Sequence, residues 1–210
     1  MRRGIDILVA GLALLAVAPL MLVVMIALLL VDGRPVLFSQ IRCGKGGRLF
    51  AVRKFRTMTG ARAADGALLP DAQRITRLGR MLRATRIDEL PQLVSIVAGD
   101  MSLIGPRPLP PAVLAQADDG GALRSRIKPG LTGWAQVNGN ARLHDRDKLA
   151  LDAWYVGHRS AMLDLVIVAR TLRVIVMGER VDEGAIRKAY AMVGAHESWR
   201  SHACGTDRRG

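Results

Sequence analysis

The chain has 210 residues, of which 31 are Lys or Arg and 18 are Asp or Glu, so its formal charge at neutral pH is +13. This length is typical of one compact domain. Half of the residues are hydrophobic, which excludes a disordered tail or a fibrous repeat, because those need low hydrophobicity or strict periodicity. Chains that are both apolar and strongly cationic often work against phospholipid headgroups, nucleic acid or phosphate-rich small molecules.

The two cysteines, Cys43 and Cys204, lie far apart in the sequence. They are too few for a disulfide framework, and the four histidines do not pair with them at the spacing of a zinc site. A reducing location that faces the cytosol is the simplest interpretation.

Residues 7–31 form an uncharged apolar run, longer than the roughly 20 residues that a membrane helix needs. The run has no signal-peptide cleavage site, so we expect it to stay in the mature protein. Basic residues stand on both sides of it, and the positive-inside rule would place both flanks in the cytoplasm. Pro19, at its midpoint, therefore predicts a re-entrant helix that breaks and returns to the same face. An ordinary tilted span that tolerates the proline is the alternative.

Two short apolar runs, at 36–38 and 49–52, flank the glycine-rich stretch 43–47. This pattern predicts a β-hairpin. A phosphate-binding loop is less favoured, because Lys45 is not followed by Ser or Thr.

Two later segments have helical character. Apolar residues between Leu90 and Val97 recur at helical spacing, and Gly99 can cap the end of that helix. Residues 161–177 are strongly apolar but carry Arg170 and Arg173 on one face, which fits an interfacial amphipathic helix and a core helix equally well.

An arginine at every third position from Arg74 to Arg86 forms a basic series that ends at Asp88 and Glu89. Asp88 stands where the N-cap of the following helix is expected, and adjacent acids at such a position are commonly caps. Here the arginines and the helix terminus favour the ionised carboxylate, so we expect Asp88 to be anionic well below neutral pH. It would then serve as a nucleophile or as a magnesium ligand. Acids in a basic pocket suit phosphoryl transfer, in which charge neutralisation carries most of the catalysis.

Two further stretches are rigid by composition. Prolines flank Arg107 in the run 105–108, and its planar guanidinium suits bidentate contact with phosphate. Glycines and a proline frame Trp134 in the run 128–134. Structural turns are the alternative for both.

Taken together and in order, these motifs resemble the small monotopic phosphoglycosyl transferases of the bacterial sugar transferase family. The resemblance extends from Arg2 to about Gly178. Its markers are Arg2-Arg3-x-x-Asp6, Pro19, Phe38-x-Gln40-x-Arg42-x-Gly44, Lys54-Phe55-Arg56-Thr57-Met58, Asp88-Glu89-Leu90-Pro91-Gln92-Leu93, the run from Gly99 to Pro108, the run from Lys128 to Gly139, and Leu151-Asp152 with Tyr155-Val156.

The resemblance implies transfer of sugar-1-phosphate from a UDP-sugar to undecaprenyl phosphate with release of UMP, the first step of exopolysaccharide, capsule, O-antigen or glycoprotein glycan synthesis. It implies a predominantly helical α+β fold, with a re-entrant helix at 1–32, a catalytic domain with interfacial amphipathic helices at 33–178, and a C-terminal tail at 179–210. The expected location is the cytoplasmic face of the bacterial inner membrane. Expected partners are the two substrates, membrane phospholipids and downstream glycosyltransferases, but not nucleic acid.

The resemblance also assigns residues. Asp88 would be the nucleophile that forms a phosphosugar intermediate and a ligand of Mg²⁺, and Glu89 would be its partner acid. The expected substrate-binding cations are Lys54, Arg56, Arg86, Arg107 and Arg142.

Two departures from the family pattern affect these expectations. Many members carry Ser-Pro at the membrane break, where this chain has Ala18-Pro19. Many also carry an arginine at the position of Asn140, and Arg142, two residues on, is the candidate replacement. A non-catalytic scaffold that binds anionic lipids is the competing hypothesis for the whole chain, because it needs only the positive charge.

Overall fold

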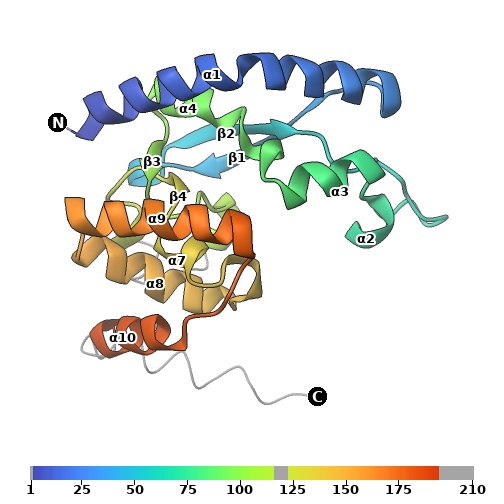
Figure 1. The fold of residues 1–210 in the computed structure, drawn as a ribbon. Coiled ribbons are helices and arrows are strands. Elements are labelled where there is room, and N and C mark those ends of the chain that lie inside the picture. The colour runs from blue at the N-terminus through green and yellow to red at the C-terminus, as the bar shows by residue number, and fades with distance from the viewer. Residues whose placement is uncertain (1, 116–122, 194–210) are drawn as a thin grey trace. The chain divides into compact units, whose positions relative to one another are not determined.

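The computed structural model describes residues 2–115 and 123–193, and Figure 1 shows their fold. Within these ranges the chain is rich in helix and contains two small two-stranded sheets. This confirms the expected predominance of helix with a minor β component. The chain forms two compact units, one of residues 1–41 and 51–99 and the other of residues 42–50 and 100–210. The domain boundaries expected at 32 and 178 stay predictions.

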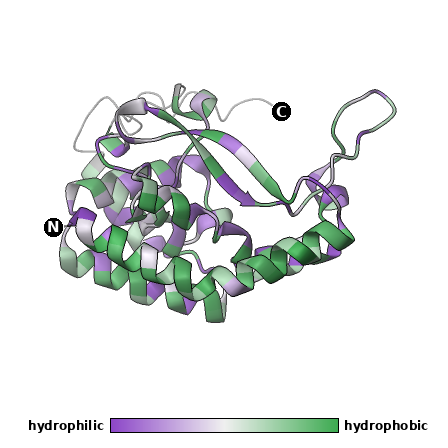
Figure 2. Ribbon diagram, turned by 90° about the horizontal axis from the view of Figure 1, so that it is seen from above, coloured by the Kyte–Doolittle hydropathy of each residue, from purple (hydrophilic) through white to green (hydrophobic). Residues whose placement is uncertain are grey.

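The first unit begins with α1, an uninterrupted helix from Arg2 to Val31 that contains Pro19. The helix is not divided into two segments at the proline, and its return to one membrane face stays a prediction. α1 is long and apolar enough to cross a membrane, and only 11% of its most apolar window is buried. Figure 2 shows this apolar character along most of the helix.

Three short helices and a 3-10 turn complete the first unit. These are α2 (Asp71–Arg74), α3 (Arg77–Ala84), the turn η2 (Ile87–Glu89) and α4 (Gln92–Ala98). α4 packs along α1 and ends at Gly99, which adopts the left-handed conformation (φ 101°) expected of a helix cap. The arginine series is thus divided between two helices and the turn that follows.

A small apolar cluster joins the second half of α1 to the rest of this unit. Val24 and Leu28 of α1 pack with Phe55 and with Leu82 of α3, and all four side chains are buried. The apolar stripe of α3 therefore faces α1. The arginines of α3 lie on the other sides of that helix.

The predicted hairpin is confirmed, with strands β1 (Leu37–Cys43) and β2 (Leu49–Phe55). A short 3-10 turn, η1 (Lys45–Gly47), connects them, and the Gly44 N–H donates to the Arg48 carbonyl at 2.7 Å. The tip of the hairpin belongs to the second unit and its base to the first.

The second unit is built around the parallel pair β3 (Ser102–Ile104) and β4 (Gly130–Thr132). A Cβ atom at Gly130 would lie 2.0 Å from the Gly105 nitrogen, so only glycine permits this approach of the backbones. The other elements described in this unit, within residues 42–50, 100–115 and 123–193, are α5 (Pro111–Ala115), α7 (Trp134–Val137), the 3-10 turn η3 (Asn140–Arg142), α8 (Asp145–Gly157), α9 (Ala161–Met177) and α10 (Glu183–Val193).

The core of the second unit lies between α7, α8 and α10, with Tyr155 and Leu151 fully buried at its centre. α9 contributes little to it, because Ile167 is the one α9 residue that is buried. Its outer face is an apolar stripe that includes Leu165, Leu172 and Val176, the last 83% exposed. Of the two interpretations of residues 161–177, the structure favours the interfacial helix over the core helix.

Candidate active site

The acid pair occupies the η2 turn between α3 and α4. Arg86 adopts a left-handed conformation (φ 60°, ψ 10°), which turns the chain sharply out of α3 just before Asp88. The α4 helix begins only at Gln92, with Pro91 as its N-cap residue. The expectation that Asp88 caps this helix directly is therefore wrong, and the acids lie in the connecting turn instead.

Asp88 is buried, with 8% of its surface exposed. Burial raises the pKa of its carboxyl above the usual range, and the neighbouring Glu89 charge raises it further. Lys54, Arg83 and Arg86 act in the opposite direction but do not reverse the result. The expectation that the arginines shift Asp88 toward its ionised form is therefore wrong, because the loss of hydration outweighs the attraction of three nearby cations.

Lys54 joins the second acid to strand β2. Its Nζ lies 2.6 Å from Oε1 of Glu89, and only 25% and 12% of the two side chains are exposed. Lys54 also acts electrostatically on Asp88. The structure therefore brings Lys54, Asp88, Glu89 and Arg86 together, as the sequence predicts.

Arg83 belongs to the same cluster, although it was expected only as one member of the arginine series. Its Nε donates to Oγ1 of the buried Thr57 at 2.9 Å, and its Nη2 lies 2.8 Å from Sδ of Met58. Its charge acts on Asp88. The register of the series could have indicated it, because Arg83 and Arg86 are the last two arginines before the acids.

Arg56 lies elsewhere and performs a different task. Its guanidinium donates to the backbone carbonyls of Asp32, Gly33 and Arg34, just past the end of α1. These bonds satisfy carbonyls that follow the last helical turn. The structure thus gives Arg56 a structural role, and its expected contact with substrate stays a prediction.

Arg107 belongs to the second unit and follows β3. Its carbonyl accepts a hydrogen bond from Arg124, which is itself buried in an ion pair of 2.8 Å with Asp152.

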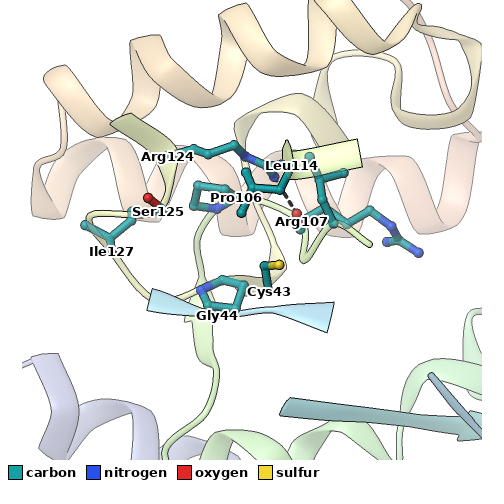
Figure 3. A pocket seen from close by; sticks show the side chains of 10 residues that line it. Cys43, Gly44, Pro106, Arg107, Leu114, Arg124, Ser125 and Ile127 are labelled. Atoms are coloured by element: carbon teal, nitrogen blue, oxygen red, sulfur yellow. Dashed lines mark hydrogen bonds between the residues drawn. The ribbon is translucent and has the colours of Figure 1, made fainter. Parts of the chain in front are cut away.

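A small pocket nearby is lined by Cys43 and Gly44 of the hairpin tip together with Pro106 and Arg124. The Arg107 guanidinium points away from these side chains (Figure 3). Burial and the charge of Arg107 lower the pKa of Arg42.

Arg142 ends the η3 turn of the second unit and is exposed. Asn140, at the start of that turn, donates from Nδ2 to Oε1 of Glu179 at 2.7 Å. Asn140 is therefore engaged with the chain that follows α9. The substrate roles of Arg107 and Arg142 stay predictions.

Asp88 and Glu89 are the residues that could hold a metal ion here. Magnesium commonly takes one or two carboxylates and completes its shell with water and substrate phosphate. No group of three or more His, Cys, Asp and Glu side chains suited to a metal occurs in residues 2–115 and 123–193. Two adjacent carboxylates are a donor set that fits a divalent ion shared with a substrate.

Comparison with known proteins identifies the family to which this chain is similar. The family model described as bacterial sugar transferase matches residues 1–178. The chain is 46% identical over 151 residues to the uncharacterized sugar transferase EpsL of Bacillus subtilis, which covers 72% of this chain and 75% of that protein.

Two other relatives have names that state an activity or a process. A UDP-N-acetylgalactosamine-undecaprenyl-phosphate N-acetylgalactosaminephosphotransferase of Aeromonas hydrophila is 41% identical over 185 residues, or 84% of this chain and 44% of that protein. The exopolysaccharide production protein ExoY of Sinorhizobium fredii is 36% identical over 188 residues, or 81% of this chain and 83% of that protein.

Proposed function

Because the chain belongs to the bacterial sugar transferase family, we propose that it transfers sugar-1-phosphate from a UDP-sugar to undecaprenyl phosphate and releases UMP. The observation that carries the proposal is the acid pair at 88 and 89, in which Asp88 is buried, beside Lys54, Arg83 and Arg86. This set supplies a nucleophile together with the positive charge that a diphosphate substrate requires.

In the first step, an oxygen of the Asp88 carboxylate attacks the phosphorus that carries the sugar. The bond from that phosphorus to the UMP oxygen breaks, and UMP leaves with the bonding electrons. In the second step, a phosphate oxygen of undecaprenyl phosphate attacks the same phosphorus and displaces Asp88, which regenerates the free carboxylate. The neighbouring Glu89 orients or deprotonates the lipid phosphate.

The cationic side chains neutralise the charge of the substrates during both steps. Lys54 is placed to contact either the acids or a phosphate, and Arg83, held by Thr57 and Met58, presents its remaining donors. Mg²⁺ held by Asp88 and Glu89 would supply further neutralisation of the diphosphate.

The reaction can be tested directly with purified protein, Mg²⁺, undecaprenyl phosphate and a panel of UDP-sugars. We expect UMP release that depends on the lipid phosphate with at least one donor. The competing scaffold hypothesis predicts salt-sensitive binding to anionic vesicles without any UMP release. The panel also identifies the sugar.

The pH dependence of the reaction follows from the environment of Asp88. Burial and Glu89 raise the pKa of Asp88, and the nucleophile must be ionised, so we expect activity to fall at a pH above the ordinary aspartate range near 4. Glu89→Gln removes the like charge, so the acid limb of its residual activity should move to lower pH. The measurement is the pH profile of UMP release for both proteins.

Protonation of Asp88 would not by itself unfold the protein at low pH. A carboxyl whose pKa is raised by folding stabilises the protein when it becomes protonated, so its contribution to stability increases as the pH falls through that pKa. An unchanged acid limb in Glu89→Gln would contradict the assignment.

We also propose that the protein is seated on one face of the membrane. Both ends of α1 are tied to the same unit, because Arg3 donates to the carbonyls of Ile96 and Val97 while Arg56 binds the carbonyls after Val31. If α1 crossed the membrane as a straight span, its two ends would lie on opposite faces. Polar groups that bind one of these ends would then have to lie across the hydrocarbon core, where unsatisfied polar groups are costly. The exposed apolar stripe of α9 supports an interfacial location for that helix.

Cysteine labelling tests this orientation. In a variant whose native cysteines are replaced by serine, Gly4→Cys and Arg34→Cys should both resist an impermeant reagent in intact cells, because both ends of α1 would face the cytoplasm. A polarity-sensitive probe at Leu172→Cys should report an apolar environment when vesicles are added, whereas one at Ala191→Cys on the exposed face of α10 should not. Labelling of one end of α1 from outside would refute the re-entrant form.

A further inference from the structure

One side chain joins the end of α1 to the start of α3. Asp32 directly follows α1, and its N–H donates to the Leu28 carbonyl of the last helical turn at 2.9 Å. Oδ2 of Asp32 accepts a hydrogen bond from the Thr76 hydroxyl at 3.0 Å, although 44 residues separate the two in the sequence. Both residues belong to the first unit. Asp32 therefore ties the segment that leaves α1 to α3.

Thr76, the partner of Asp32, is the N-cap residue of α3. Its Oγ1 accepts a hydrogen bond from the Gly79 N–H at 2.8 Å. A hydroxyl has one proton to donate and two lone pairs that accept. Because the proton of Thr76 is donated to Asp32, a lone pair is left to face the Gly79 N–H. Asp32 thus orients the cap, and loss of a cap commonly weakens the start of a helix.

The two residues that follow β2 complete this corner of the unit. Arg56 donates to the carbonyls of residues 32–34. The carbonyl of the next residue, Thr57, accepts a hydrogen bond from the Thr76 N–H at 3.1 Å. The hydrogen bonds therefore form a closed ring through the ends of α1 and β2 and the start of α3. The Asp32 carboxylate makes the bond that closes this ring.

α3 carries the effect of this corner to the acid pair. The helix has only eight residues, so its first and last turns are about 10 Å apart. Arg83 lies in the last turn, where its Nε donates to the Thr57 hydroxyl at 2.9 Å and its charge acts on Asp88. The Arg83 side chain is exposed, so water competes for that bond. The direction of α3 therefore decides where the guanidinium lies.

The geometry points to Asp32 as a positioning residue, which holds the start of α3 so that Arg83 stays beside Asp88. This inference rests on the proposed function, because it takes Asp88 as the nucleophile. It adds that the residue leaving the apolar helix sets the arrangement of charges around that nucleophile. A shift of the α1 end would therefore reach the reacting groups through α3.

The first test compares substitutions that remove or keep the hydrogen bond. Asp32→Ala should lower kcat for UMP release by roughly ten-fold, within the range known for coupled residues. Asp32→Asn keeps an oxygen that accepts from Thr76, so it should retain most of the wild-type kcat. Thr76→Ser keeps both bonds of the hydroxyl and should match the wild type. Thr76→Val removes both bonds and should be at least as slow as Asp32→Ala.

Asp65→Ala is the matched control. The Asp65 carboxylate is exposed in the same unit and accepts one hydrogen bond, from the Ala67 N–H at 2.9 Å. The substitution therefore removes the same charge and one hydrogen bond away from α3, and kcat should equal that of the wild type. Hydrogen exchange gives a readout without turnover. The amides of α3 should exchange roughly ten-fold faster in Asp32→Ala than in Asp65→Ala.

A double-mutant cycle with Arg83→Met separates positioning from general damage to the fold. Arg83→Met removes the guanidinium but keeps an unbranched side chain. Because Asp32 acts through Arg83, adding Asp32→Ala to Arg83→Met should slow UMP release by less than about three-fold. A fold that is merely loosened would lose the same factor of roughly ten in both backgrounds.

A wild-type kcat in Asp32→Ala, an Asp32→Asn protein as slow as Asp32→Ala, or additive effects in the cycle would each overturn the inference. If Asp32→Ala does not fold, the pair of Thr76→Val and Thr76→Ser decides the question by the same comparison. If the wild type releases no UMP with any donor, the proposed function fails, and hydrogen exchange still decides whether Asp32 holds α3. If UMP release depends on Asp88 but not on Asp32, only this inference fails.

Discussion

Asp88→Asn should abolish UMP release, with a loss of at least about 10³-fold, because an amide can neither attack phosphorus nor leave as a carboxylate. The same substitution should eliminate the phosphosugar adduct that the wild type forms with UDP-sugar when the lipid is omitted. Mass spectrometry of the protein detects that adduct, and its mass identifies the sugar phosphate. The substitution preserves the volume of the side chain, so the buried site should remain folded.

Asp71→Asn is the matched control. It makes the same chemical change in the same unit, at a carboxylate that is 76% exposed in α2. We expect it to leave both UMP release and the adduct unchanged. Activity that survives in Asp88→Asn would remove the covalent mechanism, even if the reaction itself is confirmed.

The position of the acid pair could be predicted because it depends on local sequence. Residues 74–99 contain the arginine series, then the two acids, then the apolar repeat that ends at Gly99. This order places the acids between a basic segment and the start of a helix. The hairpin around residues 43–47 was predictable for the same reason, since a glycine-rich turn joins its strands directly.

The ionisation of Asp88 could not be predicted in the same way. Its pKa depends on how far the η2 turn is buried, and burial arises from packing between segments that are remote in the sequence. The nearby arginines in the sequence indicate only that their charge lowers the pKa of Asp88. They do not indicate the larger effect, which is the increase caused by burial. Sequence patterns identify which charges are near an acid, but they do not show how much water remains there.

Arg56 and Arg83 show the same limit for side chains. Arg56 lies within one motif of the family and Arg83 precedes another, and both have a guanidinium that suits phosphate. The position of each guanidinium depends on partners about 20 or more residues away in the sequence. Arg56 binds the carbonyls after α1, and Arg83 binds the hydroxyl of Thr57. Only the tertiary structure distinguishes Arg56, which binds carbonyls after α1, from Arg83, whose charge acts on Asp88.

Gly79→Ala should destabilise the first unit by about 3 kcal/mol, at the upper end of the usual cost of overpacking. Alanine normally stabilises the interior of a helix relative to glycine. At Gly79 of α3, however, a Cβ atom would lie 2.1 Å from the Thr57 carbonyl oxygen and 2.7 Å from its carbonyl carbon. These are backbone atoms and cannot rotate aside, so α3 would have to move away from the end of β2.

That movement would also reach the residues around Asp88. The Thr57 carbonyl accepts a hydrogen bond from the Thr76 N–H at the start of α3, and the Thr57 hydroxyl holds Arg83 near its end. We therefore expect thermal unfolding about 10 °C lower, together with a loss of UMP release. Gly11→Ala is the control, since Gly11 lies inside α1 and a Cβ atom there meets nothing within 4 Å. A Gly79→Ala protein as stable as Gly11→Ala would show that α3 and β2 are not in this close contact, and the assignment of Arg83 to the nucleophile would lose its structural basis.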